Sequence, residues 1–208
     1  MGLSSSRCFR RSVHTVTYAA SAPATEVSIL TTKTTQLTQT ANGAALLQST
    51  ITTPSYSLQH QKLLGACVDC YDGDTVTMAL QPFGDASEPR LFKCRLEGID
   101  TPEMRGDVKN KPKAYEARNT LASWLSTTPF TGELMSSRKS IQEHLYKSKK
   151  LILVECGGWD KYGRLLVKLY SVLSVNGDHV ITRQQSLNEL LITTGFAKPY
   201  DGGTKSNF

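Results

Sequence analysis

The chain has 208 residues and carries 24 Lys and Arg against 18 Asp and Glu, which gives a net charge of +6. This length is enough for one well-buried core with additional segments. The basic balance favours an anionic partner, either nucleic acid or an acidic membrane face. No apolar run approaches the roughly 18 residues of a membrane-spanning helix, so any membrane contact is expected to be peripheral.

The five cysteines are an odd number without the spacing of a disulfide framework, and the N-terminus lacks the apolar segment of a secretory signal. We therefore expect an intracellular, reducing compartment. Cys67 and Cys70 form a single C-x-x-C within "KLLGACVDC", which has the composition of a strand. Because side chains three apart on a strand point to opposite faces, the pair is not predicted to bind zinc or to serve in redox chemistry.

Residues 1–60 are rich in Ser, Thr, Ala and Gln and show no sustained helical or strand periodicity. We predict that they form a disordered N-terminal tail. Four basic residues against Glu26, their only acid, give this segment a net charge of +3, half of the total of +6.

The first residues, "MGLSSSRCF", fit the pattern for N-myristoylation of Gly2, and Cys8 is then a candidate for palmitoylation. Two acyl chains together with Arg7, Arg10 and Arg11 would make a stable peripheral membrane anchor. An Arg- and Ser-rich, acid-poor start also fits an organelle transit peptide. An uninformative tail is the third interpretation, and the sequence leaves all three open.

After residue 60, short apolar runs alternate with turn signals and predict strands. The predicted strands lie at 62–70, 75–80, 90–98, 151–156 and 164–175, the last paired with 179–182 across an Asn-Gly-Asp turn. The first two are joined by "YDGD", whose Asp-Gly dipeptide is typical of a hairpin.

Helical spacing of apolar residues predicts a helix within 111–125, starting after Pro112, and a second within 186–200 that ends at Gly195. About five strands with interposed helices predict a small closed barrel of the α+β class rather than a parallel sheet. The predicted domain is 61–200, followed by a short tail at 201–208.

Residues 126–150 are rich in Ser, Thr and Lys and are interpreted as a surface insertion with a helix in "SIQEHLYKSKK". The insertion contains five basic residues that form either a solvated face or a contact with a nucleic-acid backbone. These are Arg138, Lys139, Lys147, Lys149 and Lys150.

Acids and arginines occur at three turns of this frame. "YDGDT" contributes Asp74, "CRLEGIDTPE" contributes Arg95, Asp100 and Glu103, and "WDKYGR" contributes Arg164. Taken singly, each has an ordinary explanation as a turn, a helix cap or a surface ion pair. Together they combine oxygen ligands suited to Ca²⁺, two arginines for a phosphodiester and a glutamate that can take a proton from water. This combination predicts phosphodiester hydrolysis.

Four motifs, "DGDT", "CRLEGIDTPE", "DKYGR" and "SLNELLITTGFA", occur in an order that resembles the staphylococcal-nuclease (thermonuclease) family. The resemblance runs from about residue 62 to 200 and is interrupted mainly by the insertion. It implies a five-stranded OB-fold barrel with packed helices. It also implies a nuclease that uses one Ca²⁺ ion, acts on DNA, RNA or both, and leaves 5′-hydroxyl and 3′-phosphate ends.

The resemblance assigns a metal-binding role to one group of residues. Asp74, Asp100 and the backbone carbonyl of Thr101 match the calcium ligands of the family, and Asp72 lies close behind them. All of these positions carry the expected residue type.

A second group matches the positions that act on the substrate. Arg95 and Arg164 match the arginines that contact the phosphate, and Glu103 matches the glutamate that acts on the attacking water. Lys161 and Tyr162 fall where the family contacts the phosphate of a bound nucleotide.

Bacterial-type members of the family continue into a further C-terminal helix, whereas this chain ends in "YDGGTKSNF". The helix of the insertion is a candidate to cover that part of the barrel. The alternative function is a catalytically silent nucleic-acid or protein-binding module, since barrels of this type also serve as binding scaffolds. The complete set of expected residues favours the enzyme, and because no feature calls for a partner subunit we expect a monomer.

Overall fold

The computed structural model describes four stretches of the chain: 46–105, 108–175, 178–181 and 185–203. The contacts divide the chain into two units, Met1–Thr53 and Pro54–Phe208, and the fold described below is that of the second unit. Most of the predicted tail, including Gly2 and Cys8, lies outside the described residues.

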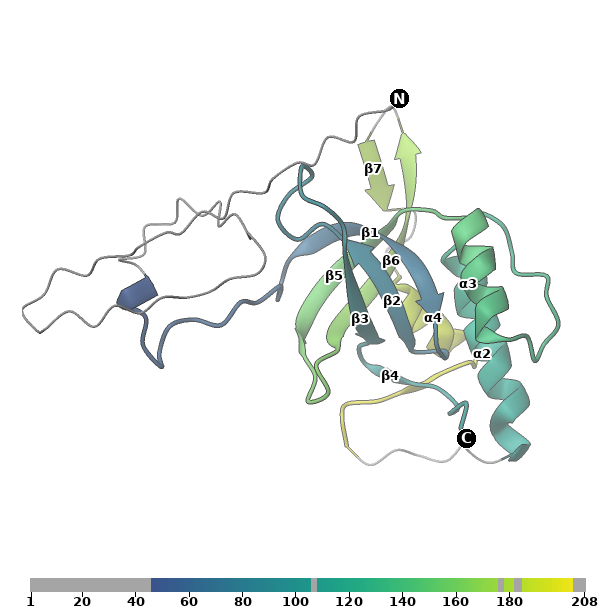
Figure 1. Ribbon diagram of the computed structural model, residues 1–208. Helices are drawn as coiled ribbons and strands as arrows, with labels where there is room; N and C mark the ends of the chain where they lie inside the picture. The colour runs from purple at the N-terminus through teal and green to yellow at the C-terminus, as the bar shows by residue number, and fades with distance from the viewer. Residues whose placement is uncertain (1–45, 106–107, 176–177, 182–184, 204–208) are drawn as a thin grey trace, which may run out of the picture. The chain divides into compact units, whose positions relative to one another are not determined.

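Five strands close into a small β-barrel (Figure 1). Neighbouring strands pair antiparallel in the order β3-β2-β1-β5-β6, and a parallel pairing of β3 with β6 closes the barrel. The barrel strands are β1 (Lys62–Cys70), β2 (Thr75–Leu80), β3 (Arg90–Leu96), β5 (Ile152–Trp159) and β6 (Leu165–Val175). The closed five-stranded barrel predicted from the sequence is therefore confirmed.

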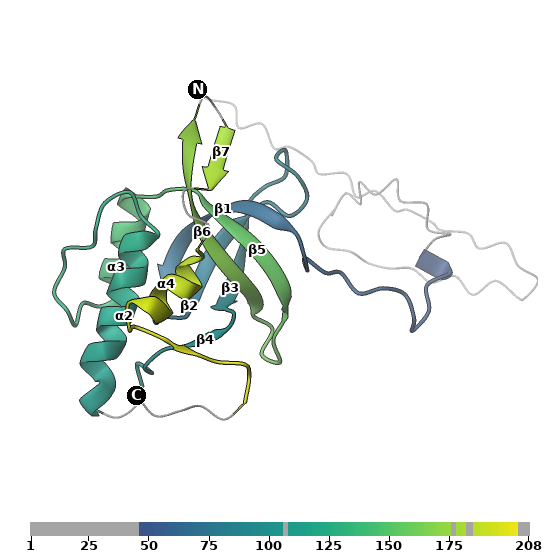
Figure 2. The same cartoon turned by 180° about the vertical axis from the view of Figure 1, so that it is seen from behind.

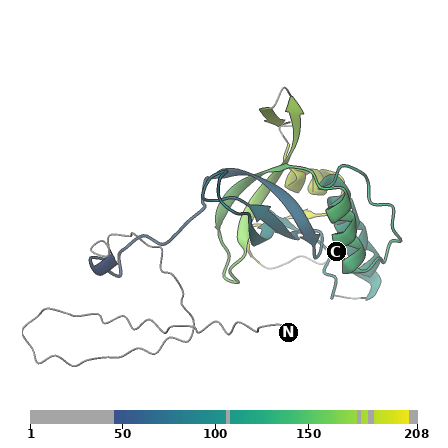
Figure 3. The same cartoon turned by 45° about the horizontal axis from the view of Figure 1, so that its top comes forward.

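Three short strands complete the β-structure. β7 (Asp178–Ile181) pairs antiparallel with the end of β6 and forms the predicted hairpin, which projects beyond the barrel in Figure 3. β4 (Ile99–Asp100) follows β3 and pairs with β8 (Lys198–Pro199). This second sheet ties the C-terminal segment to the part of the chain that carries Asp100.

The barrel interior is filled by alternating apolar side chains. Val76, Met78 and Leu80 of β2 are buried, whereas the residues between them are partly exposed. This follows from the period of two along a strand, which places every second side chain on the inward face. The core continues beyond β1 to Leu58, which is fully buried although it precedes the predicted domain boundary at residue 60.

A β-bulge changes the orientation of the cysteines on β1. The register between β1 and β2 shifts between Cys67 and Asp69, and the extra residue of a bulge interrupts the regular alternation of faces. Cys67 and Cys70 are therefore both buried, with their Sγ atoms 3.8 Å apart, and the predicted opposite orientation is wrong. The contact with Cys67 and burial raise the pKa of the Cys70 thiol well above its ordinary value, which keeps the thiol protonated.

Three helices flank the barrel. They are α2 (Lys111–Trp124), α3 (Arg138–Lys147) and α4 (Leu187–Thr193), and a 3-10 turn, η1 (Val108–Asn110), precedes α2. α2 begins at Lys111 rather than after Pro112. The backbone N–H groups of the first helical turn have no acceptor within the helix, so the N–H that Pro112 lacks is not missed there. None of the helices in the described part of the chain is long and apolar enough to cross a membrane.

The predicted C-terminal helix α4 is defined by its two ends. Ser186 and Glu189 form a capping box, in which each side chain accepts a hydrogen bond from the other residue's backbone N–H. Gly195, with φ of +80°, follows the C-cap Thr194 in a conformation that glycine adopts without strain. The predicted stop at Gly195 is confirmed.

α3 lies in the segment that was predicted to be a surface insertion, and it packs against β1 beside α2 (Figures 1 and 2). The predicted helix is present and begins at Arg138, with Ser137 as its N-cap. Ile141 and Leu145, one turn apart, are fully buried in the core. α3 is therefore more than a surface segment, because its apolar side covers the β1 side of the barrel.

An ion pair between an exposed arginine and a buried carboxylate fixes α3 to the barrel. Asp69 of β1 is buried and accepts hydrogen bonds from Arg138 Nε at 3.0 and 2.9 Å, and a further contact from Arg138 Nη2. Gln142 Nε2 donates to the same carboxylate at 3.1 Å. Because a buried carboxylate is costly unless it is paired and hydrogen-bonded, this contact specifies where the helix docks.

We predict that the two partners of this ion pair respond unequally to substitution. Arg138→Met leaves the buried carboxylate of Asp69 without its cation and should lower the free energy of unfolding by about 2–3 kcal/mol. Asp69→Asn leaves Arg138, whose side chain is 52% exposed, in contact with water and should cost only about 1 kcal/mol. Urea unfolding at neutral pH measures both. Lys139→Met, on the exposed face of α3, is the control, and equal losses for the two partners would contradict the prediction.

Candidate active site

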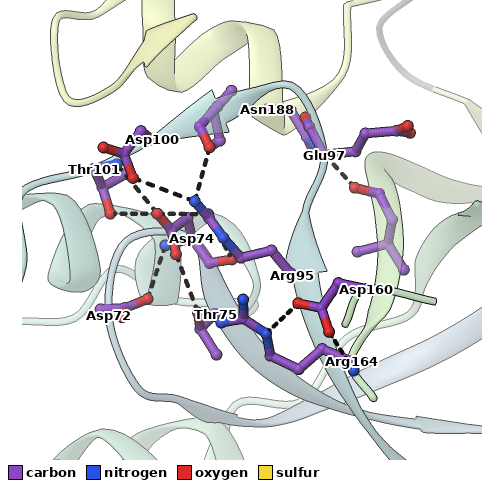
Figure 4. A network of polar contacts seen from close by, with 12 residues as sticks. Asp72, Asp74, Thr75, Arg95, Glu97, Asp100, Thr101, Asp160, Arg164 and Asn188 are labelled. Atoms are coloured by element: carbon purple, nitrogen blue, oxygen red, sulfur yellow. Dashed lines mark hydrogen bonds and ion pairs between the residues drawn. The ribbon is translucent and has the colours of Figure 1, made fainter. Parts of the chain in front are cut away.

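Three turns meet at one rim of the barrel, and each contributes charged side chains (Figure 4). The turn between β1 and β2 is held against β3 by the N–H of Leu96, which donates to the carbonyl of Asp74 at 2.8 Å. Gly73 lets this turn approach its neighbours closely: a Cβ there would lie 2.8 Å from Ala117 Cβ and 2.9 Å from Thr101 Cγ2. A side chain at this position would push Asp74 away from Thr101.

The carboxylate of Asp74 is the centre of the network. Its Oδ2 accepts hydrogen bonds from the N–H and the hydroxyl of Thr101 at 3.1 and 3.0 Å, and it contacts Arg95 Nη1 at 2.5 Å. Its Oδ1 accepts from the Thr75 hydroxyl at 3.0 Å. Asp74 is only 5% exposed, so these partners replace the water that the charge has lost.

Arg95 joins both candidate metal-binding aspartates. Its Nη2 donates to the carbonyl of Ile99 at 3.0 Å and to Asp100 Oδ1 at 3.3 Å, while Nη1 contacts Asp74. All three charged side chains are buried. A planar guanidinium can serve two carboxylates at once, and here it compensates part of their negative charge.

Arg164 is oriented by Asp160, which lies four residues before it in the turn between β5 and β6. Asp160 Oδ2 accepts from Arg164 Nε at 2.7 Å, and Oδ1 accepts from the N–H groups of Tyr162 and Arg164 at 2.9 and 2.8 Å. Partial burial would raise the pKa of Asp160, but these hydrogen bonds outweigh it and lower that pKa below its ordinary value. Arg164 Nη1 reaches the Thr75 hydroxyl at 3.5 Å and so joins the network of Asp74.

Asp72 lies behind Asp74 and accepts a hydrogen bond from its backbone. Its Oδ1 accepts a hydrogen bond from the N–H of Asp74 at 3.1 Å. Burial, and then the neighbouring charge of Asp74, raise the pKa of Asp72 from 3.8 to about 7. Near neutral pH Asp72 is therefore partly protonated in the metal-free protein, which reduces the repulsion between the two carboxylates.

A cavity of about 600 Å³ opens beside the network. It is lined by Arg95 and Arg164 and by Lys161, Tyr162 and Tyr200. The Nζ atom of Lys161 lies 5.2 Å, and the guanidinium carbon of Arg164 5.4 Å, from the ring centre of Tyr162. The volume is within the range of small-molecule sites in proteins.

The structure places the predicted site residues in three positions. Those in the polar network are Asp72, Asp74, Arg95, Asp100 and Thr101, with Arg164 joined to them through Thr75. Lys161 and Tyr162 line the adjacent cavity. Glu103 is exposed and lies in the segment that follows Asp100 and Thr101, immediately after the buried Pro102.

Two residues of the site were not assigned roles by the sequence. Thr75 bridges Asp74 and Arg164, and its position directly after "DGD" gives no sign of a partner 89 residues away. Asp160 holds Arg164. The Asp followed by a Gly-containing turn in "DKYGR" is a local signal for such a side-chain-to-backbone turn.

The candidate donors fit a hard divalent cation. In the described part of the chain, no group of three or more His, Cys, Asp or Glu side chains is arranged to hold a metal ion. The predicted ligands are instead two carboxylates, Asp74 and Asp100, and the carbonyl of Thr101. An all-oxygen set with few protein ligands suits Ca²⁺, which accepts loose geometry and completes its coordination with water and phosphate oxygens.

The protein is thus a closed α+β barrel that carries a network of aspartates and arginines at its rim. The family model described as "Staphylococcal nuclease homologue" matches residues 93–207, more than half of the chain. The chain therefore belongs to this family of nuclease-type domains, and membership implies a nucleic acid as the substrate. The match includes Arg95, Asp100 and Arg164, whereas the turn that carries Asp74 precedes it. Among curated proteins, none matches the chain.

We predict that Asp72 makes the stability of the metal-free protein pH-dependent. Because its folded pKa of about 7 lies above its unfolded value near 3.8, the folded chain retains a proton that the unfolded chain has lost between these pH values. Stability should therefore fall as the pH rises from about 4 to about 7. Asp72→Asn should abolish this fall and stabilise the protein at pH 8 by up to about 4 kcal/mol, since one pKa unit corresponds to about 1.4 kcal/mol.

Chemical denaturation in chelator, repeated between pH 4 and 8, measures this effect. Asp85→Asn, at an exposed position on the β2–β3 connection, is the matched control and should retain the wild-type profile. A wild-type profile for Asp72→Asn would show that Asp72 is ionised throughout this range.

Proposed function

We propose that the protein is a Ca²⁺-dependent nuclease that hydrolyses phosphodiester bonds of DNA, RNA or both and leaves 5′-hydroxyl and 3′-phosphate ends. The observation that carries this proposal is the buried Asp74–Arg95–Asp100 network with Arg164 oriented toward it. An arrangement with carboxylates for a cation and guanidinium groups for a phosphate, at one rim and beside a cavity, suits phosphodiester cleavage better than simple binding.

The arginines hold the scissile phosphate. Asp160 engages Arg164 through Nε, so the terminal nitrogens of that guanidinium are directed toward Thr75 and the network. Arg95 has a second role there, since the guanidinium that compensates the aspartates can also donate to a phosphate oxygen. Fixed donors of this kind are most effective where negative charge grows on the phosphoryl oxygens during displacement.

Glu103 removes the proton from the attacking water. It is exposed and lies three residues after Asp100, so it borders the site while remaining accessible to solvent. When bound to Asp74, Asp100 and the Thr101 carbonyl, Ca²⁺ supplies positive charge that polarises the phosphate and lowers the pKa of a nearby water. The water oxygen forms a bond to phosphorus while the bond from phosphorus to the 5′-oxygen breaks. The 5′-oxygen takes up a proton from solvent and leaves as a hydroxyl, and the phosphate stays on the 3′-oxygen of the other fragment.

Lys161 and Tyr162 contact the nucleotide next to the cleaved bond. Both line the cavity beside the two arginines, and the Lys161 ammonium stays close to the ring of Tyr162. The ammonium neutralises a second phosphate, and the exposed phenol offers a hydrogen bond and an apolar face.

For the N-terminus we propose acylation at Gly2 and Cys8, which would attach the protein to a membrane surface. These residues lie outside the described part of the chain, and the proposal is supported by their sequence pattern together with the neighbouring arginines. We predict that the N-terminal peptide from native cells carries a myristoyl group, as measured by mass spectrometry. A free Gly2 would exclude the anchor, and a missing N-terminal segment would favour the transit-peptide interpretation.

The nuclease proposal predicts calcium-dependent cleavage that requires Glu103. The full-length chain should cut single-stranded or duplex DNA, or RNA, with Ca²⁺ and should stop when a chelator is added. Glu103→Gln should lower kcat by about 10²- to 10⁴-fold, because general-base catalysis contributes a factor of this size. Gel electrophoresis of end-labelled substrates measures the rate and identifies the ends.

Glu88→Gln is the matched control, because Glu88 is an exposed glutamate on the β2–β3 connection, and the substitution should leave the rate unchanged. Binding of nucleic acid by a folded protein that cuts nothing with any divalent ion would instead assign the chain to the catalytically silent binding modules. Cleavage by Glu103→Gln at the wild-type rate would retain the nuclease but remove the glutamate from its mechanism.

A further inference from the structure

α3 carries a second hollow, which lies where the exposed side of the helix meets Val68 of β1. This α3 groove has a volume of about 440 Å³ and is lined by Lys139, Gln142, Tyr146, Lys147 and Lys149. Lys139 and Tyr146 are seven residues apart, two turns along the same face of the helix. The buried Ile141 and Leu145 mark the opposite side.

The groove is built on a firmly docked helix. The ion pair of Asp69 with Arg138 and the hydrogen bond from Gln142 attach α3 to β1. Gln142 therefore serves both the docking contact and the floor of the groove. Since these contacts are made within the protein, no ligand is needed to order the helix, and a ligand would meet a surface that is already formed.

The side chains of the groove are cationic and aromatic. Lys139, Lys147 and Lys149 face a single acid, Glu143, whose carboxylate lies 4.0 Å from Lys139 Nζ. Tyr146 is 73% exposed, and Lys149 Nζ lies 4.7 Å from its ring centre. A positively charged groove with an exposed ring is the surface that single-stranded nucleic acids use, with phosphates at the cations and a base stacked on the ring.

The groove also lies close to the candidate active site along the chain. Val68 of β1 borders the groove, and β1 leads into the turn that carries Asp72 four residues later, which is no more than about 13 Å away even for a fully extended chain. The ring of Tyr71, between them in sequence, lies 5.3 Å from the guanidinium carbon of Arg138. A nucleic-acid strand held at the rim can therefore reach α3 within a few nucleotides.

We propose that the α3 groove binds the single-stranded segment of the substrate that extends beyond the cleaved phosphate. The proposal rests on the nuclease function, for which it names a second substrate-binding surface. Lys147 and Lys149 contact phosphates, and Tyr146 stacks on an unpaired base. A duplex keeps its bases stacked and would leave the ring unused. An anionic membrane would attract the same lysines, but the groove belongs to a domain of a nuclease family, so a nucleic acid is the occupant that we propose.

The test measures binding separately from cleavage. The unacylated full-length chain is titrated, in chelator, into fluorescein-labelled oligothymidylate of 20 nucleotides, and anisotropy gives Kd at several salt concentrations. Replacing both Lys147 and Lys149 by Gln should weaken binding on the order of tenfold and reduce the salt slope by about 1.4, because each phosphate contact with a single strand contributes about 0.7. Tyr146→Ala should weaken binding on the order of tenfold without changing the slope.

The matched control replaces Lys62 and Lys93 by Gln, which removes the same charge from exposed positions outside the groove. This control should bind like wild type, and if it lost as much affinity as the groove variant the effect would be one of net charge alone. Thermal unfolding of each variant shows whether the fold is retained.

Cleavage with Ca²⁺ then separates this inference from the nuclease proposal. The groove variants should raise KM for the 20-nucleotide substrate about tenfold, with kcat unchanged, and should cut a dinucleotide like wild type. Unchanged Kd and KM in an active enzyme would overturn the groove and leave the nuclease. Weakened binding in a chain that cuts nothing would keep the groove and overturn the nuclease. If the variant with Gln at both Lys147 and Lys149 lost binding to phosphatidylserine vesicles but bound oligothymidylate like wild type, the lysines would be assigned to a membrane and the proposal would be overturned.

Discussion

The guanidinium of Arg95 lies buried between two carboxylates, those of Asp74 and Asp100, which would otherwise repel each other in a region with little water. Removing one partner of a buried ion pair typically costs about 3–5 kcal/mol, and a whole domain is stable by only about 5–15 kcal/mol. The aspartates can be held ready for a cation only because this arginine compensates them. The same side chain is thus a structural element and, in the proposed mechanism, also a group that acts on the substrate.

The closure of the barrel and the site are parts of one structure. The parallel seam between β3 and β6 pairs Arg95 with Leu166, so the residue that organises the aspartates also belongs to the shortest pairing of the barrel. The buried side chain of Asn188 on α4 completes this seam: its amide donates to the carbonyls of Glu97 and Val167, each at 2.9 Å. Changes in the packing of α4 would therefore reach Arg95 through β3 rather than through the cavity.

Local chemistry explains why much of this structure is visible in the sequence. The Ser186–Glu189 capping box and the helix stop at Gly195 depend on neighbouring residues, so a short window contains the whole signal. The bulge at Cys67 and the docking of α3, in contrast, depend on residues that are distant in the sequence. The bulge depends on the register with β2, and Asp69 meets a partner 69 residues away. For the same reason the sequence gives no sign of the role of Thr75, because its hydroxyl contacts Arg164, which comes from a different turn of the folded chain.

A nuclease of this type needs negative charge to bind a cation and positive charge to bind a nucleic acid, and the two oppose each other when they lie at the same site. A cation requires carboxylates that are not fully neutralised, whereas a polyanion requires excess positive charge. At the rim, Arg164 is matched by Asp160 and Arg95 by two aspartates, so this region offers little net attraction to a nucleic acid. The lysines of the α3 groove lie on a separate element with only Glu143 among them. In the proposed function, positive charge placed there would draw a nucleic-acid strand toward the protein over several ångströms without competing for the carboxylates that would bind the cation.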